Sequence, residues 1–414
     1  MPRARTNQLV VFYVGTHRLT GILVERAGDS PRILRFADVC GGDGFQKAGV
    51  LHLDKALATV EELLKRLELG ETIFEIPAYV LLSGSDLKMS RFSSSLYYTG
   101  YPRTVTSNEV RRVIEQTRSV AALPMEDWIL QVVPESFWVN DLTGIQDPVG
   151  LEAHRLAVTL QIYTAGYARL RNIARVFETF EFNLKGYFPK PLFLPEGVLN
   201  STDRENDALI IDLSDETTHL VLTSEGRILQ TKSLDFGSRL LTSRIAETWQ
   251  LSQRDAQKLK ERFGSLEVPP QFGEELIPLV EREGGENGQI RRSQFHEKFL
   301  CFGEELGAKI EQEAKFLLQA EKRGFPSLIL TGGGARLEGL LEFLGRKLSS
   351  SVRLGTPRPV ETSVEILMDP AWAGSLGFIR WICEKSRDEN VGLAKENPFG
   401  RAFLQAKEWF AAYF

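Results

Sequence analysis

The sequence is poor in the residue types that build metal sites and disulfide frameworks. Its three cysteines, Cys40, Cys301 and Cys383, lie far apart and form no Cys-x-x-Cys pair, and its five histidines are scattered. An odd number of separated cysteines does not make a disulfide framework, and no Cys/His spacing matches a structural zinc site. These absences predict a protein of a reducing compartment with no metal ligands of its own.

Long apolar runs and an excess of one charge are also missing. No stretch approaches about 18 apolar residues, so no segment is expected to span a bilayer, and the N-terminal apolar run is too short for a secretory signal. The 50 Lys and Arg against 55 Asp and Glu give a net charge of −5, which excludes nucleic-acid binding by bulk charge. With 43% apolar residues over 414 positions, the chain is long enough for two or three globular domains.

Two blocks of the sequence share one layout. Residues 9–39 and 208–236 each contain three short strands separated by turns, at Gly15-Thr16 in the first block and at Ser214-Asp215 in the second. Each block opens with a nearly all-apolar strand, as expected of a strand buried on both faces. Helical stretches follow at 60–69 and 238–263. The sequence therefore predicts an α/β fold repeated in two halves.

A third element spans residues 327–348, with the sequence SLILTGGGARLEGLLEFLGRKL. A short apolar strand leads through three glycines into an amphipathic helix. Glycines at such a junction let a phosphate or nucleoside approach backbone amides, but they also occur where a chain must simply reverse. The motif alone leaves both interpretations open.

The two hairpin turns combined with the strand–Gly-Gly-Gly–helix element resemble the actin-like ATPase superfamily. The resemblance implies an actin-like (ribonuclease H-like) fold of two lobes that close over a nucleotide. It places the phosphates at the turns of the two halves and the adenosine at the glycine turn.

Within that superfamily the chain resembles the bacterial cell-division family FtsA. The most specific stretch is 132–165, which contains Asp147-Pro148-Val149-Gly150-Leu151, and residues 236–264 and 371–381 match further family segments. The resemblance implies an α/β subdomain inserted in the first half, which serves protein contacts. The implied domains are a first lobe of 1–82, 166–202 and 370–387, the insert 83–165, a second lobe of 203–237 and 309–369, a partner-binding subdomain 238–308, and a linker with a terminal helix at 388–414.

The resemblance also implies a set of nucleotide-binding residues and no catalytic or metal-ligating side chain. The nucleotide-binding positions are Gly15, Thr16, Asp212, Ser214, Thr217, Gly237, Gln257, Lys260, Gly332, Gly333, Gly334 and Arg336.

The nucleotide site departs from the family pattern at its phosphate end. Tyr13 stands where the family has an acid, the glycines expected after Asp212 are absent, and Asp215 and Glu216 add two carboxylates. A like charge at about 4 Å from a phosphate oxygen costs about 4 kcal/mol at an effective dielectric of about 20, which Mg²⁺ would offset. We therefore expect ATP with Mg²⁺ to bind weakly or not at all, and the protein to be at most a weak ATPase.

The C-terminal segment has the pattern of an interfacial helix. After a polar linker, residues 397–414 place aromatic side chains along one face, and the helix is too short to span a bilayer. A terminal helix packed on the protein's own core fits the pattern alone equally well, but the linker and the family resemblance favour a membrane surface. The expected membrane contacts are Phe399, Phe403, Trp409, Phe410, Tyr413 and Phe414.

The resemblance implies that residues 238–308 bind the C-terminal peptide of FtsZ. Glu297 and Lys298 occupy the family's partner-binding positions, with Lys298 where the family has arginine. Lysine keeps the charge but loses the bidentate fork. A solvated lysine with no partner is the alternative for such a residue.

The leading hypothesis is an FtsA-like protein at the cytoplasmic face of the inner membrane at the division site. It would tether FtsZ filaments and recruit later division proteins, and the residues do not decide whether it polymerises with itself. A PilM-type adaptor of pilus assembly is the alternative, but that type lacks the insert in this form and the terminal amphipathic helix. A kinase of the same superfold would need an intact phosphate turn.

Overall fold

The computed structural model describes residues 7–27, 30–42, 44–68, 70, 75–267, 275–279, 288–324, 326–362 and 364–391. The chain divides into two compact units, and each is described by itself. The first unit comprises Met1–Leu192, Val360–Val364 and Phe378–Phe414, and the second comprises Phe193–Pro359 and Glu365–Gly377.

The first unit is built on a five-stranded sheet with the strand order β13-β6-β1-β2-β3. β1 pairs antiparallel with β2 and parallel with β6, so an antiparallel meander of three strands continues into two parallel strands. The strands are β1 (Gln8–Val14), β2 (Arg18–Ala27), β3 (Ser30–Cys40), β6 (Ala78–Leu82) and β13 (Leu184–Pro189), with a small hairpin of β4 (Phe45–Gln46) and β5 (Gly49–Val50).

Helices cover both faces of this sheet, which explains the all-apolar sequence of β1. One face packs on α1 (Leu53–Leu67) and α3 (Tyr167–Glu178) in one apolar cluster. On the other face, Phe378 of α10 (Ala373–Val391) lies 4.9 Å from Phe188 and 5.8 Å from Tyr79, measured between ring centroids. The carboxyl ends of β1, β6 and β13 therefore meet at one buried edge.

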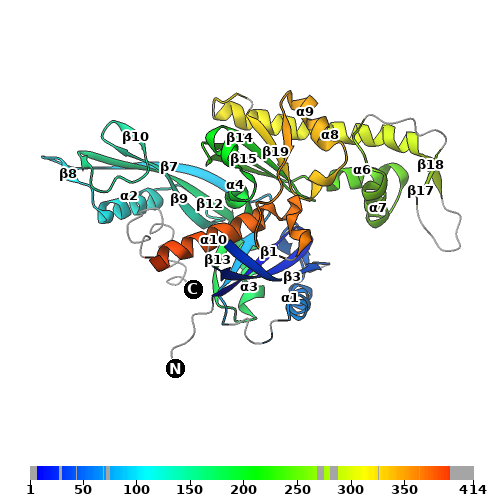
Figure 1. The fold of residues 1–414 in the computed structure, drawn as a ribbon, viewed down its shortest axis with the longest axis horizontal. Coiled ribbons are helices and arrows are strands. Elements are labelled where there is room, and N and C mark those ends of the chain that lie inside the picture. Colours follow the sequence, from blue (N-terminus) through cyan, green and yellow to red (C-terminus); the bar gives the residue numbers. More distant parts are fainter. Residues whose placement is uncertain are drawn as a thin grey trace. The chain divides into compact units, whose positions relative to one another are not determined.

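An α/β subdomain is inserted between β6 and α3 (Figure 1). Its sheet has the order β10-β9-β12-β7, and α2 (Ser107–Ser119) packs on one face of it. Thr106 caps α2, because its side chain accepts from the Glu109 amide while the Glu109 carboxylate accepts from the Thr106 amide. The strands are β7 (Lys88–Tyr97), β9 (Asp127–Val139), β10 (Leu142–Ile145) and β12 (Arg155–Gly166), with a short pair of β8 (Arg103–Thr104) and β11 (Glu152–Ala153).

One ion pair fastens both ends of the insert to its host. Arg169 donates from Nε to Asp86 Oδ2 at 2.7 Å, and its Nη2 lies 2.6 Å from Asp86 Oδ1. The same guanidinium donates to the carbonyls of Ala48 and Ser83, and Asp86 accepts from the Gly166 amide. The chain that enters the insert near residue 86 and the chain that leaves it near residue 166 are thus held together.

The second unit repeats the sheet of the first, with the order β16-β15-β14-β19-β20. β14 pairs antiparallel with β15 and parallel with β19, as β1 does with β2 and β6. The strands are β14 (Ala208–Leu213), β15 (Thr218–Ser224), β16 (Arg227–Leu234), β19 (Ser327–Thr331) and β20 (Val352–Leu354). The predicted repetition of one fold in two halves is therefore observed.

Helices again cover both faces of this second sheet. α8 (Arg292–Ala320) and α9 (Leu340–Leu348) contribute to the larger apolar cluster. On the opposite face, Leu194 and Val198 of α4 (Leu194–Val198) pack with Ala373 at the start of α10. Short helices complete the unit: α5 (Ser201–Glu205), η3 (Gly333–Arg336), η4 (Glu365–Met368) and η5 (Pro370–Trp372), while η2 (Lys190–Phe193) leads into α4.

The boundaries between the units differ from the expected ones. The structure divides the chain at Leu192 and at Gly377, whereas the sequence placed these boundaries at 202 and at 370. The reason is that α4 and the first turn of α10 bury their apolar side chains on the second sheet. The insert occupies the expected position in the first half.

The segment expected to bind a partner peptide contains two helices before α8. α6 (Arg239–Trp249) ends at Gln250, whose φ of 50° is left-handed, and α7 (Gln253–Phe263) starts after the Ser252 cap. The single helix expected over 238–263 is therefore broken. Before α8, β17 (Leu276–Pro278) and β18 (Gln289–Arg291) pair antiparallel as a short two-stranded sheet.

Candidate functional site

The predicted nucleotide-binding residues gather at the carboxyl ends of the central strands in each unit. In the second unit, β14 ends at Leu213 and β19 at Thr331, and the two strands are parallel neighbours. Asp212 and the glycine turn that starts at Gly332 are therefore adjacent. This is the edge at which open α/β sheets bind ligands.

The second turn, residues 214–217, is closed by ion pairs with α6. Arg239 lies with Nη2 2.6 Å from Asp215 Oδ2 and with Nε 3.1 Å from Glu216 Oε1. The Glu216 side chain is only 11% exposed. The two carboxylates that the sequence suggested would repel phosphate are thus both paired with one guanidinium, from a residue that the sequence interpretation had not singled out.

Backbone hydrogen bonds attach the same turn to the start of α6. The amides of Ser238 and Arg239 donate to the carbonyls of Ser214 and Asp215, at 2.9 and 2.7 Å. A Cβ atom on Gly237 would lie 2.4 Å from the Asp215 carbonyl oxygen. Glycine is therefore required at position 237 by this close approach alone.

Lys260 of α7 lies beside the second turn and contacts the N-cap residue of α6. Its Nζ donates to the Ser238 carbonyl at 3.3 Å, and the side chain is buried. Burial lowers the pKa of Lys260, while the nearby charge of Asp215 opposes this shift. Gln257, one turn earlier in α7, accepts from Thr242 and donates to Glu261, so it links α7 to α6.

The glycine turn is explained largely by packing. A Cβ on Gly332 would lie 2.5 Å from Asp212 Oδ1, and one on Gly334 would lie 2.6 Å from the Leu213 side chain. Gly333, by contrast, is exposed, and a Cβ placed on it would have its nearest neighbour 4.0 Å away, on Ala371. Arg336 pairs with Asp369, with Nε 2.5 Å from Oδ2.

The first unit holds the remaining predicted nucleotide residues, Gly15 and Thr16, both buried. The Gly15 amide donates to the Arg18 carbonyl at 2.9 Å, which closes the hairpin turn. The Tyr13 ring lies 3.1 Å from where a Cβ of Gly15 would be. Lys190, fully buried after β13, places its Nζ 5.5 Å from the centre of that ring.

These observations allow the fit to a magnesium nucleotide to be judged for each unit alone. In the second unit, carboxylates paired with Arg239 stand where the family pattern has glycines, and in the first unit an aromatic ring lies against the turn. No three His, Cys, Asp or Glu side chains come together as a metal site in the described part of the chain. At the phosphate end, both turns thus depart from the family pattern, whereas the glycine turn at Gly333 is open.

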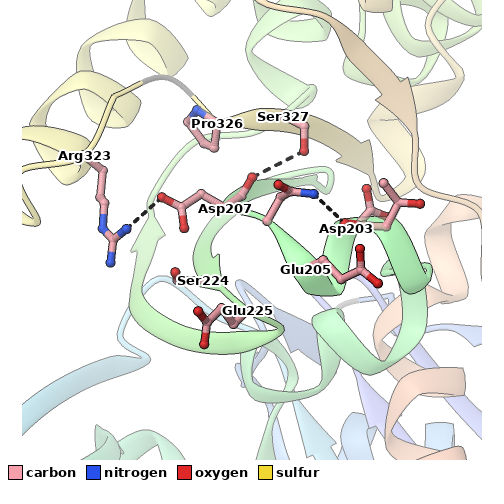
Figure 2. Close-up of a pocket in the computed structure, with 10 residues that line it drawn as sticks. Asp203, Glu205, Asp207, Ser224, Glu225, Arg323, Pro326 and Ser327 are labelled. Atoms are coloured by element: carbon pink, nitrogen blue, oxygen red, sulfur yellow. Dashed lines mark hydrogen bonds and ion pairs between the residues drawn. The ribbon is translucent and has the colours of Figure 1, made fainter. Parts of the chain in front are cut away.

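A pocket of the second unit lies elsewhere. It has a volume of about 680 Å³ and is lined by Asp203, Glu205, Asp207 and Glu225, together with Arg323. Figure 2 shows Arg323 pointing at Asp207, with an ion-pair distance of 3.0 Å. Asp207 directly precedes β14, so this pocket lies at the amino ends of the strands, away from the nucleotide residues predicted in this unit.

The predicted partner-binding residues lie together on the surface of α8. Glu297 and Lys298 are exposed, while Phe295 and Phe299 on the opposite side of the helix are buried in the core of the unit. The six predicted membrane-contacting residues of 399–414 lie outside the described residues. In the part of the chain that is described, no helix is both long and apolar enough to cross a membrane.

Two residues that contact the predicted site were missed by sequence reasoning. Arg239 follows Gly237 by two positions, and its signal was the excess of acidic residues in the turn, which a buried or half-buried turn must neutralise. Lys190 gave no signal, because a lysine after Pro189 is ordinarily a solvated surface residue.

Comparison with known proteins identifies the family. A family model described as "Cell division protein FtsA" matches residues 209–377, and one described as "SHS2 domain inserted in FTSA" matches residues 84–164. FtsA of Escherichia coli (strain K12) is 23% identical over 394 residues, which cover 92% of each chain. FtsA of Bacillus subtilis (strain 168) is 21% identical and covers 93% of this chain and 86% of its own.

Solved structures show the fold. A chain of the "PilM-PilN type IV pilus biogenesis complex" is 16% identical with a TM-score of 0.66, and 92% of this chain and 99% of that chain are covered. MreB5 of Spiroplasma citri bound to AMPPNP is 10% identical with a TM-score of 0.55, over 94% of this chain and 100% of the other. The actin-like fold with an inserted subdomain is confirmed. Because both family models and the relatives that span most of the chain agree, this protein belongs to the FtsA family of cell-division proteins.

Proposed function

We propose that this protein is an adaptor of cell division that tethers FtsZ filaments to the cytoplasmic face of the membrane at the division site. The observation that supports the FtsZ contact best is the exposed pair Glu297 and Lys298 on α8. Both side chains face solvent while the neighbouring phenylalanines anchor the helix, so a partner peptide can reach them without any rearrangement of the core.

The membrane contact is assigned to the C-terminal helix of residues 397–414. In the sequence pattern five of its aromatic residues share one face and Trp409 flanks that face, and burying an aromatic side chain contributes about 1.5–3 kcal/mol. Several such residues together are enough to hold a helix at a bilayer surface.

The insert is proposed to bind later division proteins or further copies of the same chain. Its open sheet face carries Arg155 with the rings of Tyr97 and Trp138 on either side, at 5.8 and 5.9 Å from the guanidinium carbon. Tyr97 is 72% exposed and Trp138 is 39% exposed. Tyrosine, tryptophan and arginine are the residues that dominate binding energy at protein interfaces.

Adenine nucleotide is proposed to bind weakly or not at all, with negligible hydrolysis. The reasons are the Tyr13 ring against the first turn and the paired carboxylates in the second turn. A direct titration of the full chain with ATP and Mg²⁺ tests this part. Micromolar affinity with measurable turnover would contradict it.

Liposome co-sedimentation tests the adaptor function. The full chain is expected to pellet with vesicles and to bring FtsZ down, whereas a chain ending at Lys395 should leave both in the supernatant. Lys298→Glu should still pellet but lose FtsZ. Lys315→Glu is the matched control, since Lys315 is a half-exposed lysine on the same helix, about 25 Å further along. Pelleting that does not depend on the terminal helix would contradict the membrane assignment.

A PilM-type adaptor of pilus assembly remains the second candidate. The solved PilM chain is covered over 99% of its length, so similarity of fold does not separate the two functions. The match to the family model for the insert of FtsA favours division. Vesicle binding by the terminal helix without recruitment of FtsZ would favour the pilus-type function instead.

A further inference from the structure

The second turn is held by four charged side chains of the protein itself. Asp215 and Glu216 belong to the turn, Arg239 to α6 and Lys260 to α7. We call these four residues the turn cluster. These four side chains carry no formal net charge together, and the buried Asp212 just before the turn is a further carboxylate outside the cluster.

Arg239 is the central member of the turn cluster. Its Nε and Nη2 donate to Asp215 Oδ2 at 3.0 and 2.6 Å, and Nε also lies 3.1 Å from Glu216 Oε1. A guanidinium that contacts two carboxylates is a strong and well-oriented partner. The positive groups that would otherwise attract an anion to this turn are thus already engaged.

The backbone around the turn cluster leaves little freedom. The amide of Arg239 donates to the Asp215 carbonyl at 2.7 Å, so the residue that supplies the guanidinium is also bonded to the turn through its main chain. The close approach at Gly237, 2.4 Å from a Cβ to the Asp215 oxygen, brings the turn and the start of α6 into direct backbone contact. The turn is therefore ordered by contacts within the unit.

We propose that Arg239 takes the place of a bound ligand at the second turn: it orders the turn and, by pairing with Asp215 and Glu216, keeps the turn closed to phosphate anions. The fold of the second unit then needs no nucleotide for its stability. This inference deepens the nucleotide part of the proposed function and is independent of FtsZ tethering. If Arg239 has this role, removal of the two carboxylates should open a binding site for anions at the turn.

The test is a thermal unfolding experiment on the full chain with pyrophosphate as the probe. The variant D215N/E216Q keeps the size of both side chains but removes the two negative charges of the turn cluster, so that Arg239 and Lys260 are no longer balanced within it. Millimolar pyrophosphate should raise the unfolding midpoint of this variant by about 2–4 °C, and the shift should fall in high salt. The wild-type midpoint should not respond.

Glu196→Gln provides the matched control. Glu196 accepts from Arg204 at 2.7 Å and from Arg358 at 2.9 Å, so its replacement also frees two cationic side chains in the second unit, but away from the turn. Its midpoint should respond to pyrophosphate no more than that of the wild type. This control separates a specific site from a general effect of added positive charge.

The outcomes distinguish the inference from the broader nucleotide proposal. A wild-type midpoint that rises as much as that of the variant would overturn both. A folded D215N/E216Q protein that ignores pyrophosphate would overturn the role of Arg239 while leaving weak nucleotide binding intact. If the double variant does not fold, the single variant Asp215→Asn, which leaves Glu216 on Arg239, is measured and judged by the same two criteria with a smaller expected shift.

Discussion

Replacement of Gly377 by alanine tests the closest backbone approach in the second unit. A Cβ on Gly377 would lie 2.1 Å from the Phe193 carbonyl oxygen and 2.7 Å from the Gly197 nitrogen. The relation is mutual, because a Cβ on Gly197 would lie 2.1 Å from the Ala373 carbonyl oxygen. The first turn of α10 and the short helix α4 therefore touch main chain to main chain.

These contacts determine the expected loss in the free energy of unfolding. Overpacking a well-packed site costs about 1–3 kcal/mol, and the upper end applies here because a backbone oxygen cannot rotate away as a side chain would. Alanine in a helix recovers about 1 kcal/mol relative to glycine. We therefore expect Gly377→Ala to lower the free energy of unfolding by about 2 kcal/mol, and the unfolding midpoint by about 4–8 °C.

Urea denaturation followed by circular dichroism measures this change on the full chain. Gly333→Ala is the control, since the nearest atom to its Cβ would be 4.0 Å away and the residue is exposed. That variant should stay within about 0.5 kcal/mol of the wild type. The reasoning would be refuted by a Gly377→Ala protein as stable as the Gly333→Ala protein.

Three further changes test other contacts. Arg169→Lys keeps the charge but loses the two-pronged contact with Asp86, so we expect a loss of about 1–3 kcal/mol in urea denaturation; an unchanged midpoint would mean that the contact does not fasten the insert. Thr106→Ala removes the side-chain acceptor for the Glu109 amide and should cost about 1 kcal/mol, whereas an effect below about 0.3 kcal/mol would contradict the capping role. Burial lowers the pKa of His296, against an opposing hydrogen bond with the backbone, so the unfolded state binds a proton that the folded state resists. Wild-type stability should therefore fall as the pH drops below about 6.5, by at most about 1.4 kcal/mol per unit, relative to His296→Gln; parallel pH profiles for the two proteins would disprove this.

Apolar patterning was enough to predict the first three strands of each unit and β19, but not β6, β13 or β20. The strand around Val10 and the strand around Ile210 are nearly all apolar because helices cover both faces of each sheet. Burial on both faces demands an apolar side chain at nearly every position of a short segment, so this pattern can be recognised in the sequence. The Thr106 cap is local in the same way, since its partner lies only three residues away.

The features that the sequence did not predict depend on contacts between residues far apart in the chain. The boundary of the second unit falls before α4 because Leu194 and Val198 pack on Ile210 and Val221, a choice that only the tertiary structure makes. The neutralisation of Asp215 likewise depends on a side chain 24 positions away. Local propensity contains no information on which of many arginines a carboxylate will meet.

The break between α6 and α7 was only partly predictable from the sequence. Ser252 followed by Asp255 is a recognisable helix start, and its hydroxyl accepts from the Asp255 amide. The sequence nevertheless indicated one helical stretch over 238–263. The left-handed Gln250 has no sequence signature of its own.

The two ends of the insert lie next to each other, which affects how the insert and its host can diverge in evolution. Lys88 at the start of β7 pairs directly with Thr164 near the end of β12, so the chain leaves and re-enters the host at one place. No strand of the insert joins the host sheet, but Leu130 of β9 packs in the apolar cluster of the host and the Gln131 side chain donates to the Tyr187 carbonyl of β13. A subdomain of another sequence placed here would therefore have to keep the pair of Asp86 and Arg169 and supply equivalents of Leu130 and Gln131, while the rest of its surface is free to diverge from the host.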